Sequence, residues 1–329
     1  MAIDTQPGHR LDKRPGGNRP PQMASRFLKE NGALGALIAM VVLLAFMSGD
    51  FLTTQNLLNV GVQAAVTAIL AFGVTFAIVS GGIDLSVGSV AAFSGIMLGW
   101  LGTQGVPIWL AFVLAIATGT ACGLVNGLLI SYGKLPPFIA TLAMLSAARG
   151  LALVLSDGTP ITLPESVSWI GETIGDWLPV PVIVMIVMCV ITALVLIKTY
   201  SGRAMYAIGS NEEAAHLSGI RVRRQKLVIY ALVGAFAAVA GIVLASRLAS
   251  AQPQAADGYE LDAIAAVVIG GASLAGGVGK ASGTLVGALI LAVLRNGLNL
   301  LDVSAFWQQV VIGAVIALAV LLDTLRRRA

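Results

Sequence analysis

Charged side chains are scarce in this chain. Asp, Glu, Lys and Arg make up only 11% of the 329 residues, whereas 57% are hydrophobic. A soluble globular domain carries about 25% charged residues, so this composition excludes a soluble class. The hydrophobic runs are long and rich in Gly and Ala, and alternating segments of strand length do not recur. We therefore predict an all-α polytopic membrane protein rather than a membrane barrel.

Cysteine and histidine are also rare, which excludes several kinds of site. Cys122 and Cys189 each lie in a hydrophobic run, where a small buried thiol is more typical than a disulfide. The two histidines, His9 and His216, are far apart in the sequence. They predict no His/Cys metal centre.

Motifs of nucleotide binding and hydrolysis are missing. Residues 279–281, G-K-A, resemble the end of a phosphate-binding loop, but Leu274 stands where that loop needs glycine and Ala281 where it needs Ser or Thr. Neither G-x-S-x-G nor H-E-x-x-H occurs. The sequence predicts a protein that is not an enzyme and holds no cofactor of its own.

The basic residues gather in three patches, which explains the net charge of +4. The patches lie in residues 1–31, 199–226 and 326–329, and the positive-inside rule assigns all three to the cytoplasm. The cytoplasmic position of these residues accounts for the positive charge, so the charge does not point to a nucleic-acid partner. We expect a disordered cytoplasmic tail over 1–31, a transmembrane domain over 32–325 and a cytoplasmic C-terminus over 326–329.

The hydrophobic runs predict about ten transmembrane helices. Six precede the central polar loop and four follow it, so both termini are expected in the cytoplasm. The short third and eighth spans are candidates for broken or re-entrant segments, and residues 51–63 are expected to form an interfacial segment. The expected spans are 33–47, 64–79, 90–101, 107–130, 135–156, 182–197, 227–248, 264–274, 281–300 and 307–322.

Two hydrophobic segments break at paired glycines. The first, S-G-G-I-D-L-S-V-G-S at 80–89, contains an acid and three serines, and the second is A-V-V-I-G-G-A-S-L at 266–274. Irregular backbone at membrane depth needs cover from protein or a water-filled cavity, and paired breaks point to a translocation path. Residues 77–85, A-I-V-S-G-G-I-D-L, are similar to 266–274, which predicts two related halves of the chain. Chance similarity between Gly/Ala-rich helices is the alternative. The path candidates here are Gly81, Gly82, Asp84, Ser86, Gly88, Gly270, Gly271 and Ser273.

Four charged residues lie within the predicted membrane region, at Asp84, Arg149, Asp262 and Arg295. Arg149 and Arg295 are expected in the outer half, where they either line a vestibule with Asn296 or extend to the headgroups. Asp84 either caps a helix in the broken segment or lies on the path. Acids near the midplane are too few for a typical ion-coupled carrier, which disfavours a stand-alone secondary carrier or channel.

The central loop, residues 199–226, is predicted to contain a short helix. Asn211 is suited to cap it, Glu212 and Glu213 suit its N-terminus, and Gly219 suits its end. A short helix held between two spans fits contact with a soluble partner, and a plain connector helix is the alternative. Glu213, Ala214, Ala215 and Gly219 resemble the E-A-A-x-x-x-G loop of the membrane subunits of ATP-binding-cassette (ABC) importers, which docks into the ATPase.

Four stretches together, 80–90, 135–150, 207–220 and 259–279, resemble the permease subunits of ribose-type bacterial sugar importers. The resemblance implies a homodimer in the inner membrane, a cytoplasmic ABC ATPase that binds ATP and Mg, and an extracytoplasmic sugar-binding protein. It also implies that residues 213–219 touch the ATPase and that 81–89 and 270–277 flank the path. The related branched-chain amino-acid permeases usually carry an Asn-Phe version of G-G-I-D-L, so Asp84 and Ser86 disfavour that alternative.

Overall fold

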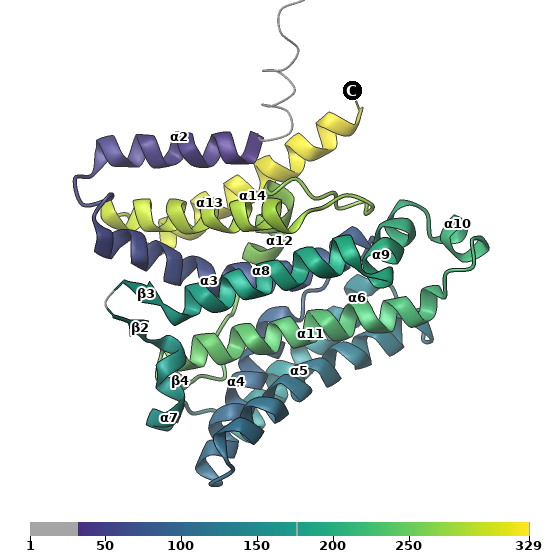
Figure 1. Ribbon diagram of the computed structural model, residues 1–329, viewed down its shortest axis with the longest axis horizontal. Helices are drawn as coiled ribbons and strands as arrows, with labels where there is room; N and C mark the ends of the chain where they lie inside the picture. The colour runs from purple at the N-terminus through teal and green to yellow at the C-terminus, as the bar shows by residue number, and fades with distance from the viewer. Residues whose placement is uncertain (1–31, 176, 329) are drawn as a thin grey trace, which may run out of the picture.

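The computed structural model describes residues 32–175 and 177–328 of the chain. Long helices dominate it (Figure 1), and they follow the hydrophobic runs of the sequence. In chain order the helices are α2 (Gly32–Met47), α3 (Thr54–Val79), α4 (Val87–Thr103), α5 (Ile108–Ser131), α6 (Pro137–Leu155), α7 (Glu165–Ser168), α8 (Val180–Lys198), α9 (Tyr200–Ser210), α10 (Glu212–Leu217), α11 (Val222–Arg247), α12 (Tyr259–Ile269), α13 (Ala281–Leu300) and α14 (Ala305–Arg328).

Two of these helices, α3 and α4, form the centre of the bundle. Nearly all of α3 from Ala64 onward is buried, as are most residues of α4. Helix α11 packs against α3, α4 and α5, while α12 and α13 cover another side of α3. The Phe76 ring of α3 meets the Phe236 ring of α11 edge to face, with centroids 5.3 Å apart. Because these helices are apolar on most faces, they are buried by one another rather than by one amphipathic stripe.

The small irregular elements gather at one end of the bundle, and α10 lies at the opposite end (Figure 1). The first end carries the short antiparallel pairs β1 (Ile161–Thr162) with β4 (Ser250–Ala251) and β2 (Thr173–Ile174) with β3 (Leu178–Pro179), together with a 3₁₀ turn at Trp169–Gly171. The β1–β4 pair joins the two longest connectors of this end. The predicted polar connectors and the predicted central loop therefore lie at opposite ends.

Six described helices are long and apolar enough to cross a membrane, namely α3, α5, α6, α8, α11 and α13. Helices α2 and α4 and the Ala305–Leu318 part of α14 are shorter apolar helices. This arrangement is an all-α, multi-pass membrane fold. The count of ten spans and the cytoplasmic position of both termini remain predictions.

Three sequence expectations need correction. Residues 51–63 do not form a separate interfacial segment, because α3 begins at Thr54 and runs unbroken for 26 residues. Asn56 in its first turn is buried, and its amide pairs with the amide of Asn296 at 2.7 and 3.0 Å, whereas Thr54, Gln55 and Leu57 are exposed. The span expected at 264–274 is helical only over Tyr259–Ile269.

The third correction concerns the central loop, which contains more than one helix. Besides α10 it holds α9, and α11 already begins at Val222. The predicted cytoplasmic tail, residues 1–31, lies outside the described residues.

Candidate functional site

Helix α10 forms where the sequence predicted a short capped helix. The Asn211 side chain accepts a hydrogen bond from the backbone N–H of Ala214 at 2.9 Å, which satisfies a free donor of the first turn. Glu212 and Glu213 lie in that turn, where their charge favours the helix dipole. Gly219 follows the helix with φ +86°, a conformation that glycine adopts readily.

A small apolar cluster fixes α10 on its neighbours. Ala215 is only 4% exposed and packs with Ala204 and Ile208 of α9 and with Val222 of α11. Glu213, Ala214 and Gly219, by contrast, are exposed. The residues predicted to couple to an ATPase are Glu212, Glu213, Ala214, Ala215 and Gly219. Of these, Ala215 therefore holds the helix in place from inside, while the other four are exposed.

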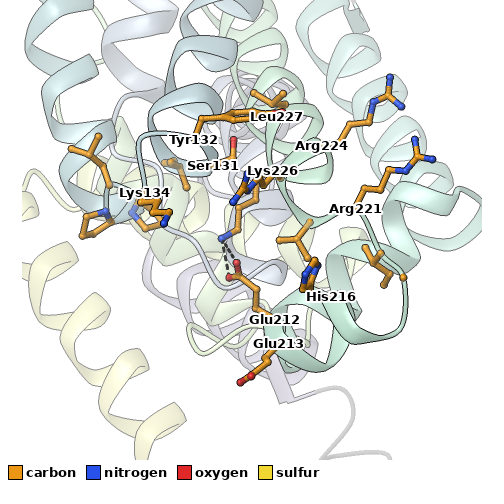
Figure 2. A pocket seen from close by; sticks show the side chains of 18 residues that line it. Ser131, Tyr132, Lys134, Glu212, Glu213, His216, Arg221, Arg224, Lys226 and Leu227 are labelled. Carbon is orange, nitrogen blue, oxygen red and sulfur yellow. Dashed lines mark hydrogen bonds and ion pairs between the residues drawn. The ribbon is translucent and has the colours of Figure 1, made fainter.

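An ion pair gives α10 a second connection to α11. The Lys226 ammonium donates to both carboxylate oxygens of Glu212, at 2.7 and 2.8 Å. The Lys226 side chain is 19% exposed and that of Glu212 is 55% exposed, so water screens the pair only in part. Figure 2 shows Glu212 directed toward Lys226, whereas the Glu213 side chain points away from it.

A cleft of about 1320 Å³ lies beside this ion pair, between the turn that joins α5 to α6 and the segment from α10 to the start of α11 (Figure 2). Cations on its wall give it a basic character, and the Arg223 guanidinium lies 5.9 Å from the ring centre of Tyr132. The ionisable residues that line it are Lys134, Glu212, Glu213, His216, Arg221, Arg223, Arg224 and Lys226.

The two glycine breaks have the same backbone geometry. At the end of α3, the N–H of Gly81 donates to Ile78 O and that of Gly82 to Ala77 O, both at 2.9 Å. At the end of α12, the N–H groups of residues 271 and 272 donate to the carbonyls of 268 and 267, at 2.9 and 3.1 Å. Both are Schellman ends, with φ +80° at Gly81 and +90° at Gly271.

The structural match is shifted by one residue from the sequence match. In the first break the left-handed position is the first glycine of the pair, Gly81, and in the second it is the second glycine, Gly271. Ser80 and Gly270 are the equivalent cap residues. The similarity of residues 77–85 to 266–274 places Gly81 opposite Gly270, because the sequence does not show which glycine of each pair takes the left-handed conformation.

Through Gly209, helix α9 touches the end of α3 and the loop that follows the second break. A Cβ on this residue would collide with Val79 O at the end of α3 and lie 2.5 Å from Gly277 N in the loop after α12. The two loops are also joined directly, because Gly277 N donates to Val79 O at 2.8 Å. The Tyr206 hydroxyl of α9 donates to Gly279 O at 2.7 Å, and burial raises the pKa of Tyr206.

The sequence reasoning did not find α9. Its signal lies in residues 200–210, Y-S-G-R-A-M-Y-A-I-G-S, where Ala204, Met205 and Ile208 recur at helical spacing and are buried. The polar residues of the loop concealed this pattern. Helix α9 is the element that joins α10 to the glycine breaks.

Asp84 stabilises the backbone of the first break. Its carboxylate accepts from the backbone N–H of Ser86 at 2.8 Å and from the Ser86 hydroxyl at 2.6 Å. The amide of Asn126 in α5 donates to the same hydroxyl at 3.0 Å. Asp84 is 1% exposed, and its bonds stabilise the turn at Ser86, the residue that precedes α4. Its place on the path stays a prediction. Gly88, one turn later, lies against Ala256 O and the Glu260 carboxylate, so its lack of a side chain allows this approach.

The remaining predicted path residues are held by other protein groups. The Arg149 guanidinium donates to Pro253 O and Ala255 O at 2.7 and 2.8 Å, and the Arg295 guanidinium donates to the Asp262 carboxylate at 2.9 Å. Both guanidinium groups therefore have protein partners. Asn296 is buried against Asn56 and fixes α13 to α3. Ser273 makes two backbone bonds in the loop after α12: its N–H donates to Val278 O at 3.0 Å, and its carbonyl accepts from Gly276 N at 2.9 Å.

Comparison with known proteins identifies a family that fits this architecture. The model of the branched-chain amino acid transport system/permease component family matches residues 56–320. The chain belongs to this permease family. A ribose import permease of Bacillus subtilis is 48% identical over 299 residues, covering 90% of this chain and 93% of the relative. A ribose import permease of Escherichia coli K12 is 44% identical over 304 residues, covering 90% and 94%.

A xylose transport system permease of Haemophilus influenzae is 36% identical over an alignment of 362 residues, covering 89% of this permease and 96% of the relative. No solved structure matches the chain. The resemblance to ribose-type ABC permeases is confirmed, and the protein is a multi-pass inner-membrane permease. Because these named relatives are transport subunits, the comparisons support a transport subunit rather than an enzyme.

Proposed function

We propose that this permease is the membrane subunit of an ABC importer for a monosaccharide. The observation that carries the proposal is the 44–48% identity, over nine-tenths of the chain, to permeases named for ribose import. The relatives cited above are named for ribose and xylose, two pentoses, so the substrate class is a small sugar or related polyol. The branched-chain amino-acid alternative is not favoured, although the family model takes its name from that branch.

The energy for import comes from a separate ATPase chain in this proposal. That chain binds ATP and Mg and contacts the exposed face of α10, where Glu213, Ala214 and Gly219 are accessible. Movement of α10 passes to α9 through the cluster of Ala204, Ile208 and Ala215. Helix α9 in turn rests on both glycine breaks through Gly209, so closure of the ATPase changes the ends of α3 and α12 together.

Three further features belong to the same proposal. A second copy of the permease completes the path, and an extracytoplasmic binding protein delivers the sugar at the end that carries β1–β4. Ten spans place both termini on the α10 side, in agreement with the basic residues near α10.

Vesicle reconstitution tests this function directly. The permease is reconstituted with its ATPase and sugar-binding protein, and uptake of radiolabelled D-ribose is followed with ATP inside or outside the vesicles. We expect uptake only when ATP reaches the ATPase. Uptake of leucine instead of ribose would establish the amino-acid alternative, and ribose uptake by the permease alone without ATP would establish a stand-alone carrier.

A further inference from the structure

A second cavity, of about 490 Å³, lies between the first turns of α12, the end of α13 and the first half of α14. Arg295 on its wall is adjacent to Asn296, which pairs with Asn56 in the first turn of α3. The cavity is therefore near the start of α3 and far from α10. Arg295 lies about fourteen residues into α13, which corresponds to roughly 20 Å of helix. The cavity is therefore within the outer half of the membrane in the proposed topology.

The wall of this cavity carries polar groups that lipid tails would leave without hydrogen-bond partners. It contains the ion pair of Arg295 with Asp262, whose side chains are 35% and 10% exposed, and the amides of Gln308 and Gln309 on α14. A charged group at membrane depth costs about 3 kcal/mol on insertion scales unless it is paired or faces water or protein. The pairing accounts for part of this cost, and the exposed part of Arg295 needs a polar neighbour.

The chemistry of the wall suits a polyhydroxylated ligand. Carboxylates accept hydrogen bonds from hydroxyls, a guanidinium donates to them, and an amide does both. Tyr259, Leu261 and Ile312 supply the apolar surface that a sugar ring also needs. The volume falls in the range of about 300–1,000 Å³ that small-molecule pockets occupy.

We propose that this cavity is a monosaccharide subsite in the permease itself, which the sugar occupies after the binding protein releases it. Arg295, Asp262 and Gln309 contact its hydroxyl groups, and Tyr259 packs against its ring. This inference rests on the proposed function. It adds a site for the solute within this chain, where the sequence indicated only a path.

Thiol protection tests occupancy without a transport assay. Gln309→Cys is exposed in the cavity, and Gln104→Cys, in the turn after α4, provides a matched exposed glutamine far from it. Both are labelled in the assembled complex with a membrane-impermeant maleimide, and the unsubstituted chain with Cys122 and Cys189 gives the background. We expect D-ribose to slow labelling of Gln309→Cys at least fivefold and to leave Gln104→Cys unchanged.

Two labelling results overturn the proposal. Labelling of Gln309→Cys at the same rate with and without saturating D-ribose shows that no sugar enters the cavity. A Gln309→Cys thiol that is never labelled in the assembled complex shows that a second copy of the chain or lipid fills the space.

Transport by Gln309→Leu provides the second measurement, with Gln104→Leu as its control. Loss of one hydrogen bond to the sugar is expected to lower D-ribose uptake roughly tenfold, while ATP hydrolysis stimulated by the loaded binding protein stays near the wild-type rate. Misfolding would lower both quantities, so it is distinguished by the ATPase readout. Unchanged uptake overturns the subsite, whereas a wild-type complex that imports no D-ribose overturns the proposed function itself.

Discussion

Replacing Gly209 with alanine adds a methyl group at the point where α9 meets both glycine breaks. That methyl would overlap Val79 O and lie 2.5 Å from Gly277 N. Both neighbours are backbone atoms, and Gly277 N is already bonded to Val79 O. No side chain can rotate away to make room, so α9 or the loop after α12 has to shift.

The expected cost follows from overpacking. Forcing a methyl group into a packed site costs about 1–3 kcal/mol. If this free energy is lost from the coupling between α10 and the breaks, the equilibrium constant of that coupling changes by about 5- to 150-fold. We expect the bundle to remain folded, because α3, α4 and α11 pack against one another independently of Gly209.

Loss of sugar uptake and loss of thermal stability should therefore separate in the Gly209→Ala variant. In reconstituted vesicles we expect D-ribose uptake to fall at least fivefold, while the unfolding temperature of the purified permease changes by only a few degrees. Gly150→Ala is the matched control, because a Cβ at Gly150 of α6 has no neighbour within 4 Å. Wild-type uptake by Gly209→Ala would refute the role of α9 in joining α10 to the breaks.

The remaining predictions concern the same end of the molecule. Glu213→Lys should abolish transport and co-purification of the ATPase while the permease stays folded in the membrane, and full activity would contradict docking at α10. Glu212→Lys or Lys226→Glu alone should lower uptake by no more than about fivefold, because a partly solvated pair contributes about 0.2–1 kcal/mol. The double exchange should restore uptake, and additive losses in the double variant would contradict the pairing. Tyr206→Phe should destabilise the α9 contact by about 1 kcal/mol, measured by hydrogen exchange of residues 200–210. Burial raises the pKa of Tyr206 in the folded protein, so its bond to Gly279 should be intact below about pH 10 and lost as the pH rises through the folded pKa. Hydrogen-exchange protection of residues 200–210 that does not change at high pH would contradict this.

The polar groups within the bundle stabilise particular helix pairs. The Asn56–Asn296 amide pair joins α3 to α13, and a hydrogen bond of 2.8 Å between the Thr75 and Thr284 hydroxyls joins the same two helices at the other end. In a membrane, the hydrophobic effect does not hold helices together, so such bonds and close packing contribute much of the specificity. Removal of one partner would leave the other unsatisfied in an apolar surrounding.

Local sequence was sufficient for the class of fold and for α10. Hydrophobic run length alone predicted the long helices, since each needs about 20 apolar residues to cross the bilayer. The cap at Asn211, the acids after it and the glycine at 219 fixed the short helix, because each of these signals acts within one helical turn. The bond of Asp84 to Ser86 is equally local, because its two partners are only two residues apart.

Tertiary structure decided what depends on residues far apart in the chain. Asn56 and Asn296 are 240 residues apart, and no local pattern indicates that their amides pair. The contact of Gly209 with Val79 and Gly277, the one-residue offset between the two glycine breaks, and the cavity between α12, α13 and α14 also follow from how the helices pack. Hydropathy and capping specify each helix by itself, whereas the neighbours of a helix are selected by shape and by hydrogen bonding across the whole bundle.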